Sequence, residues 1–165
     1  MKKLFILFCL LLSGLVNAQS EQLAFNYFDR GEFDKAITLL EELVVKQPGN
    51  YAYFQKVVAC YQQLKQYDKA ENAISNKMKT SKMPNLYVEL GYNFQLQKNE
   101  AKAIVNYNLA IEQVVLQSNY AYSVAAAFEQ KTLLDWAVKA YEVGKLGNPN
   151  LNFDYQVALL NGQMG

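Results

Sequence analysis

The chain has 165 residues, of which 52% are apolar and 19% are charged, and its formal net charge is +1. This composition excludes a chain that is disordered throughout, because there is enough apolar surface to build a sizeable core. The near-neutral charge gives no electrostatic reason to expect a nucleic-acid partner, since such partners are bound by basic surfaces.

Residues 1–18 are organised like a secretory signal peptide. A basic start (residues 1–3) precedes an apolar run, Leu4–Val16, and small residues then lead up to Ala18. A membrane anchor is the alternative, but the run is shorter than the roughly 20 apolar residues that span a bilayer. We predict cleavage after Ala18, export, and no stable membrane insertion of the mature chain. Loss of two lysines lowers its net charge from +1 to −1.

The rest of the chain, residues 19–165, repeats itself with a period of 33 or 34 residues. Four alanines mark the phase, namely Ala36, Ala70, Ala103 and Ala137. Other apolar positions recur in the same register: Leu23, Val57, Leu90 and Val124; Tyr27, Tyr61, Phe94 and Phe128; Leu40, Ile74, Tyr107 and Tyr141. Agreement at this many positions indicates a genuine repeat.

Each repeat is predicted to hold two helices, because its apolar residues recur at spacings of three and four. A short polar turn separates the helices, and Gly31 is expected to act there as a left-handed cap in the first repeat. Lys65, Lys98 and Thr132 take this position later. Asp34, Asp68 and Asp135 come near the start of the second helices, where the helix dipole favours negative charge. Pro48 and Pro149 close repeats.

Small residues at fixed phases are expected to bring the paired helices close together. The distance between packed helices depends on the side chains at their crossing. Ala24, Gly91 and Ala125 lie on first helices, and the four phase alanines lie on second helices. We therefore interpret Gly91 as a packing residue, and we expect Ala103→Leu to destabilise the fold by roughly 1–3 kcal/mol through overpacking.

The third repeat resembles the tetratricopeptide repeat family. It matches the family pattern at Tyr87, Leu90, Gly91, Phe94, Ala103, Tyr107 and Ala110. The other repeats depart from the pattern; the first, for example, lacks the glycine. The resemblance implies an all-α, right-handed superhelical solenoid of about four helix pairs plus one further helix. It also implies a concave inner surface formed by the first helices.

Residues 151–165 read as the first helix of a fifth repeat, and Gly165 is in phase with Gly31. Terminal caps of repeat proteins usually present a polar outer face. This segment is largely apolar, so we expect the array to be truncated at its C-terminal end; a terminal cap is the alternative.

Catalytic chemistry is not expected. There is no histidine, and the glycines form no phosphate-binding loop. After signal cleavage Cys60 is the single thiol, and we interpret it as a buried apolar residue. Glu41, Glu42 and Glu100 are interpreted as solvated. We therefore predict no enzyme activity, no catalytic or metal site and no cofactor.

A binding groove is the functional site that the resemblance implies. It would lie on the first helices and bind a peptide or protein segment, since rigid aromatic side chains give contact area at low entropy cost. The competing interpretation is that Phe25, Phe28, Tyr92 and Tyr122 are buried between repeats. A basic clamp for a C-terminal carboxylate is not supported, because Glu21 and Phe25 occupy its positions. The predicted groove residues are Phe28, Gln55, Lys56, Gln62, Val88, Glu89, Tyr92, Gln95, Tyr122, Ser123 and Glu129.

The leading functional hypothesis is a non-catalytic scaffold in the periplasm or cell envelope of a Gram-negative-type bacterium. Two alternatives remain: a carbohydrate-binding or uptake accessory protein, or the N-terminal module of a longer protein with a downstream effector domain. The basic run Lys77, Lys79 and Lys82 is interpreted as a solvated helix end, with contact to anionic lipid as its alternative.

Overall fold

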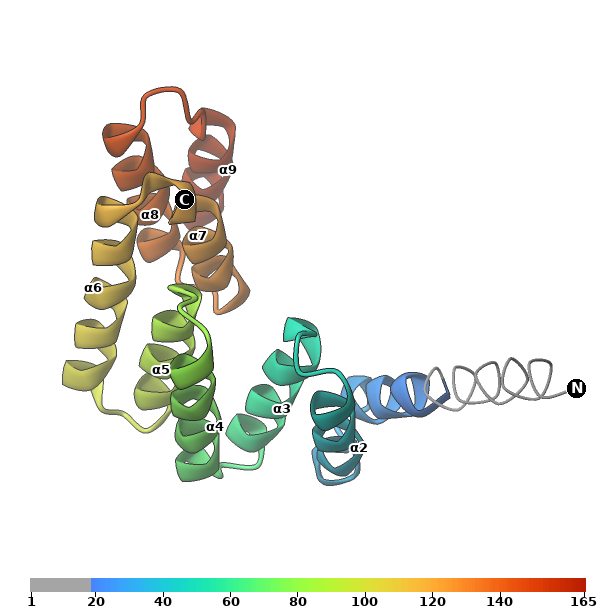
Figure 1. Cartoon of the computed structure of the whole chain (residues 1–165). Helices are drawn as coiled ribbons and strands as arrows, with labels where there is room; N and C mark the ends of the chain where they lie inside the picture. The colour runs from blue at the N-terminus through green and yellow to red at the C-terminus, as the bar shows by residue number, and fades with distance from the viewer. Residues whose placement is uncertain (1–18) are drawn as a thin grey trace, which may run out of the picture. The chain divides into compact units, whose positions relative to one another are not determined.

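The structure is a computed structural model that describes residues 19–165, so the predicted signal peptide lies outside the described residues. The chain divides into two compact units, the first ending at Ala70 and the second beginning at Glu71 (Figure 1). Residues 19–165 form helices, turns and loops, and no strand is found among them. None of the helices in this part of the chain combines the length and apolarity needed to cross a membrane.

The first unit begins, in its described part, with a helix over residues 19–29. Helices α2 (Phe33–Lys46) and α3 (Tyr51–Gln63) follow, and α4 (Tyr67–Thr80) contains the boundary between the units. The core of this unit is formed by Ala24, Ala36, Leu40, Leu43, Tyr53, Val57 and Cys60. Ala36, Leu40 and Val57, which occupy recurring positions of the repeat, therefore pack together in this core.

The second unit contains two complete helical hairpins. Helices α5 (Asn85–Leu96) and α6 (Glu100–Leu116) form the first; α7 (Ala121–Gln130) and α8 (Leu134–Gly147) form the second, after the short 3-10 helix η1 (Ser118–Tyr120). Helix α9 (Asp154–Met164) packs on α8 (Figure 1). The expected fifth first helix is thus present.

The phase alanines are buried, as predicted. Ala36, Ala70, Ala103 and Ala137 are all inaccessible to solvent. On the first helices Ala24, Gly91 and Ala125 are buried as well. The hairpin of α5 and α6 shows why small residues recur, because a Cβ atom added to Gly91 would lie 2.4 Å from a ring carbon of Tyr107 and 3.1 Å from the carbonyl oxygen of Ala103. These distances leave no room for a methyl group.

The same backbone turn separates the two helices of all four hairpins. Gly31, Lys65, Lys98 and Thr132 have φ of 76°, 57°, 61° and 58°. At the last turn the Thr132 N–H donates to the Glu129 carbonyl (2.9 Å) and the Leu133 N–H donates to the Phe128 carbonyl (3.0 Å). This pair of bonds defines a Schellman motif, and the turns after residues 29, 63 and 96 repeat it. The predicted cap at Gly31 is confirmed.

Thr132→Gly should stabilise the second unit by about 1 kcal/mol, because the left-handed conformation strains a β-branched residue but not glycine. Thr132→Ala, which keeps a Cβ atom, should gain less. The measurement is urea unfolding followed by the fluorescence of Trp136, the single tryptophan of the chain. Equal midpoints for Thr132→Gly and the parent would show that the turn is not strained.

Cys60 lies at 0% exposure in the core of the first unit. Burial raises the pKa of its thiol to about 12, although the charge of Lys56 opposes the shift. The thiolate is the reactive form of cysteine. The interpretation of Cys60 as a buried apolar residue is confirmed.

In a Cys9→Ser variant, which leaves Cys60 as the single thiol, we expect almost no reaction with a disulfide reagent at pH 8 without denaturant. Only about one thiol in ten thousand would be ionised at that pH, and the sulfur is covered. Full reaction is expected in 8 M urea (about that concentration unfolds most domains). Rapid reaction of the folded protein would contradict this burial.

Candidate functional site

In the first unit the structure brings together Lys56, Phe28 and Phe25. The Lys56 ammonium lies 3.9 Å from the centroid of the Phe28 ring and 4.6 Å from that of Phe25. Both distances are within the range of cation–π attraction. The Phe25 ring also meets the Tyr53 ring edge-on, with centroids 6.1 Å apart. Phe28 and Lys56 therefore contact each other, and both stay half-buried.

Gln55 and Gln62 differ in their surroundings. Gln55 is half-buried on α3. Gln62 is buried, and its side-chain amide nitrogen has no hydrogen-bond partner within the described part of the chain. Because a buried donor of this kind costs free energy, Gln62 is a polar group held inside the fold and presents little surface to a ligand.

In the second unit Glu89, Tyr92 and Lys131 form a cluster. The Lys131 ammonium lies 3.0 Å from Glu89 Oε2 and 5.0 Å from the centroid of the Tyr92 ring. The Glu89 side chain is 1% exposed and that of Lys131 is 14% exposed. Neither Glu89 oxygen accepts a hydrogen bond of good geometry from residues 19–165, so the contact is an ion pair only. Lys131 neutralises a buried carboxylate between two hairpins of this unit.

Gln95 and Glu129 take part in the same interaction in successive hairpins. The Tyr107 hydroxyl donates to Gln95 Oε1 (2.6 Å), and the Tyr141 hydroxyl donates to Glu129 Oε1 (2.9 Å). Burial is the main cause that raises the pKa of both tyrosines, and the Glu129 carboxylate adds to it for Tyr141. Each bond ties the second helix of a hairpin to its first helix and holds the accepting side chain of the first helix in place.

Tyr122 is the most exposed aromatic residue among the predicted groove residues, at 61%. Its ring lies beside that of Tyr141, with centroids 6.5 Å apart, and Tyr141 in turn contacts Phe153 at 4.7 Å. Ser123 is exposed and donates to the Tyr120 carbonyl. Val88, by contrast, is fully buried in the core and offers no side-chain surface. We therefore leave Val88 out of the surface considered below.

Sequence reasoning did not select Lys131, which pairs with Glu89, or Tyr155, which is exposed on the last helix. Lys131 lies in the turn just before the left-handed Thr132. Its position is not one of the recurring apolar positions of the repeat, so the pattern gave only this weak signal. The signal for Tyr155 was its distance of 33 residues from Tyr122, the period of the repeat. Tyr155 lies on α9 and is 76% exposed.

The basic run near the end of α4 consists of Lys77, Lys79 and Lys82. Lys79 donates to the side chain of Asn76 in the preceding turn. Lys82 lines a shallow cavity of about 270 Å³ together with Met78, Met83 and Tyr87. Lys79 and Lys82 are exposed, in keeping with a solvated helix end, whereas Lys77 is half-buried.

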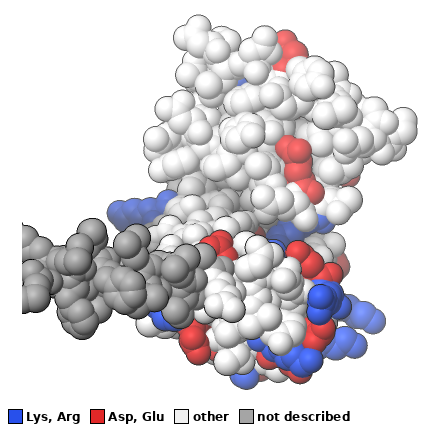
Figure 2. Space-filling model, turned by 90° about the vertical axis from the view of Figure 1, so that its right-hand side faces the viewer, with Lys and Arg blue, Asp and Glu red and all other residues white. Residues whose placement is uncertain are grey.

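Charged side chains are sparse on one side of the second unit. Figure 2 shows the side on which Figure 1 places α7 and α9, and that surface is largely free of coloured atoms apart from a few acidic groups. Within residues 19–165 no three His, Cys, Asp or Glu side chains are placed to hold a metal ion. Tyr122 on α7 and Tyr155 on α9 are exposed aromatic side chains of these helices.

Solved structures share this fold. The MamA protein is 19% identical over 89% of this chain and 81% of its own, with a TM-score of 0.50. BtubC (BKLC) from P. vanneervenii is 15% identical over 89% of this chain and 69% of its own, also with a TM-score of 0.50.

No family model matches the sequence, and no curated protein does so either. At these identities the likeness concerns the fold alone. With the repeat period, the helical hairpins and the four matching turns, it shows an all-α helical-repeat fold, which is consistent with the resemblance to tetratricopeptide repeats in the sequence.

Proposed function

We propose that the protein is a non-catalytic scaffold that binds a peptide or protein segment on the surface of its first helices. The observation that carries the proposal is Tyr122, a large aromatic side chain that stays 61% exposed on a first helix of a rigid hairpin. Its neighbour Tyr141 is held by the bond to Glu129, so the base of the surface is ordered before a partner arrives. A preorganised aromatic surface loses little entropy on binding.

We also propose that the protein works after export, in the periplasm or cell envelope. The support is the pattern of residues 1–18, with its basic start, apolar run and Ala18. The mass of the protein isolated from its host measures this directly. A mature N-terminus at Gln19 is expected, and an intact Met1 in the functional protein would contradict export.

Site-specific photo-crosslinking tests the binding surface. A photoreactive phenylalanine analogue replaces Tyr122 in the full chain, expressed in its own host. The matched control places the same group at Leu146 on the second helix α8, where the side chain is 83% exposed. A covalent adduct with one protein is expected from position 122 and none from position 146.

Two outcomes would contradict the proposal. Equal adducts from both positions would show that exposure alone, and not the first-helix surface, decides contact. A carbohydrate adduct at position 122 without any protein adduct would support the alternative of an uptake accessory protein.

A further inference from the structure

Apolar side chains recur on the first helices of the second unit at the period of the repeat; Tyr122, Tyr155 and Leu159 are exposed, whereas Tyr92 and Ala126 are half-buried. Tyr122 and Tyr155 are separated by 33 residues, and Tyr92, Ala126 and Leu159 by 34 and 33. Tyr155 and Leu159 lie on α9 and are 76% and 51% exposed. We call these five residues the tyrosine face. Two positions of the repeat, four residues apart, thus carry apolar side chains in successive first helices.

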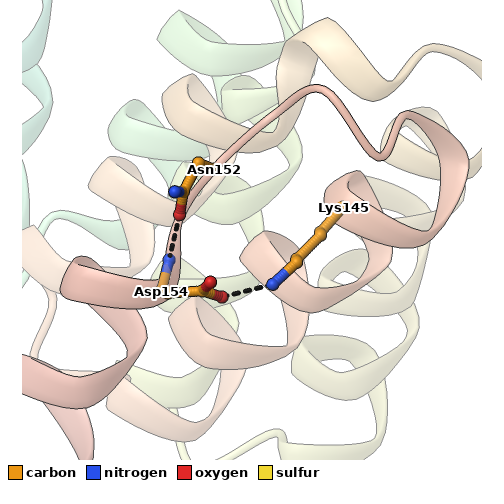
Figure 3. A network of polar contacts seen from close by, with 3 residues as sticks. All are labelled: Lys145, Asn152 and Asp154. Atoms are coloured by element: carbon orange, nitrogen blue, oxygen red, sulfur yellow. Dashed lines mark hydrogen bonds and ion pairs between the residues drawn. The ribbon is translucent and has the colours of Figure 1, made fainter.

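The first helices that carry most of this face have almost no charge. Helix α7 contains only Glu129 and helix α9 only Asp154. Glu129 accepts the hydroxyl of Tyr141, and Asp154 pairs with Lys145 while its backbone N–H donates to Asn152 (Figure 3). Both carboxylates therefore already have partners inside the unit.

Basic side chains around the face are engaged in the same way. Lys131 is largely buried between Glu89 and the Tyr92 ring. Lys102 lies over Phe94 and Lys139 over Trp136, both extending from second helices. Each of these three ammonium groups thus contacts a carboxylate or an aromatic ring within the unit.

The lack of charge on the face then determines which side chains of a partner can pack against it. Placing a charged side chain against the tyrosine face would remove water from it without supplying a counter-charge, which is costly. Apolar and aromatic side chains gain contact area with tyrosine rings without that loss. Figure 2 shows few charged side chains on this side of the second unit.

We propose that the tyrosine face binds an uncharged segment of the partner, rich in apolar side chains, and that ionic contacts contribute little to its affinity. This inference rests on the proposed function and adds to it the chemistry of the partner. It differs from recognition of a charged chain end, since none of the five residues of the face carries a positive charge.

The test uses random twelve-residue peptides (about the length that crosses a few helices) selected on the full mature chain. The selected peptides are expected to be depleted in Asp, Glu, Lys and Arg relative to the library. Fluorescence anisotropy of the tightest peptide should give a Kd that changes less than about twofold between 0.05 and 0.5 M salt (roughly a tenfold range of ionic strength). Tyr122→Ala and Tyr155→Ala should each weaken it about tenfold.

The matched controls are Val115→Ala and Leu146→Ala, which remove exposed apolar side chains from second helices and should leave Kd unchanged. Charged peptides that still require Tyr122 would overturn the uncharged partner but leave the proposed binding surface intact. Peptides that bind regardless of Tyr122 and Tyr155, or no selected peptide at all, would overturn both. A dimer that Tyr155→Ala dissociates would assign the face to a second copy instead and overturn the inference.

Discussion

Lys131→Met is expected to destabilise the second unit by about 3–5 kcal/mol, because it leaves the buried Glu89 carboxylate without its counter-charge. The Lys131 ammonium lies 3.0 Å from Glu89 Oε2, and the glutamate side chain is only 1% exposed. Within the described chain neither oxygen has a hydrogen bond to compensate. Urea unfolding followed by Trp136 fluorescence measures the effect, since Trp136 belongs to this unit.

The double variant Glu89→Leu with Lys131→Met provides the control. Replacing both members of a buried ion pair by apolar residues of similar volume is often neutral or stabilising. The double variant should therefore unfold near the parent midpoint and well above Lys131→Met. If Lys131→Met lowered the free energy of unfolding by less than about 1 kcal/mol, the pair would contribute no more than an exposed ion pair does.

Gly91→Ala should destabilise the same unit by about 1–3 kcal/mol, although alanine favours helices by up to about 1 kcal/mol over glycine. The new methyl carbon would lie 2.4 and 2.5 Å from two ring carbons of Tyr107. That ring cannot move freely, because its hydroxyl is bonded to Gln95 and its ring packs against Phe128 and Trp136 at 5.4 and 5.3 Å. Overpacking therefore outweighs the gain in helix propensity.

Gly162→Ala is the matched control for Gly91→Ala. Gly162 is also inside a helix, but a Cβ atom there would meet nothing within 4 Å. This variant should be as stable as the parent or slightly more so. If Gly91→Ala unfolded at the same urea concentration as Gly162→Ala, the close crossing of α5 and α6 would be wrong. Ala103→Leu, on the facing helix, tests the same crossing from its other side.

The predicted groove residues divide according to what the tertiary structure does with them. Tyr122 remains exposed on α7, whereas Val88, which occupies the same phase one repeat earlier, is fully buried. Gln95 and Glu129 share a phase, and both accept a bond from a tyrosine of the facing helix. The position of a residue in the repeat therefore predicts which way its side chain points within a hairpin. The neighbouring side chains decide how much of that side chain stays exposed to solvent.

The sequence by itself determined the repeat, the helical hairpins, the buried alanines and the left-handed turns. These features depend on the spacing and size of residues within about 34 positions of one another, and both can be read directly from the sequence. Only the tertiary structure decided that Glu89 pairs with Lys131, that Val88 is covered and that Tyr122 and Tyr155 stay exposed. Such contacts join residues from different hairpins, and their energy depends on distance and burial, neither of which a periodic pattern contains.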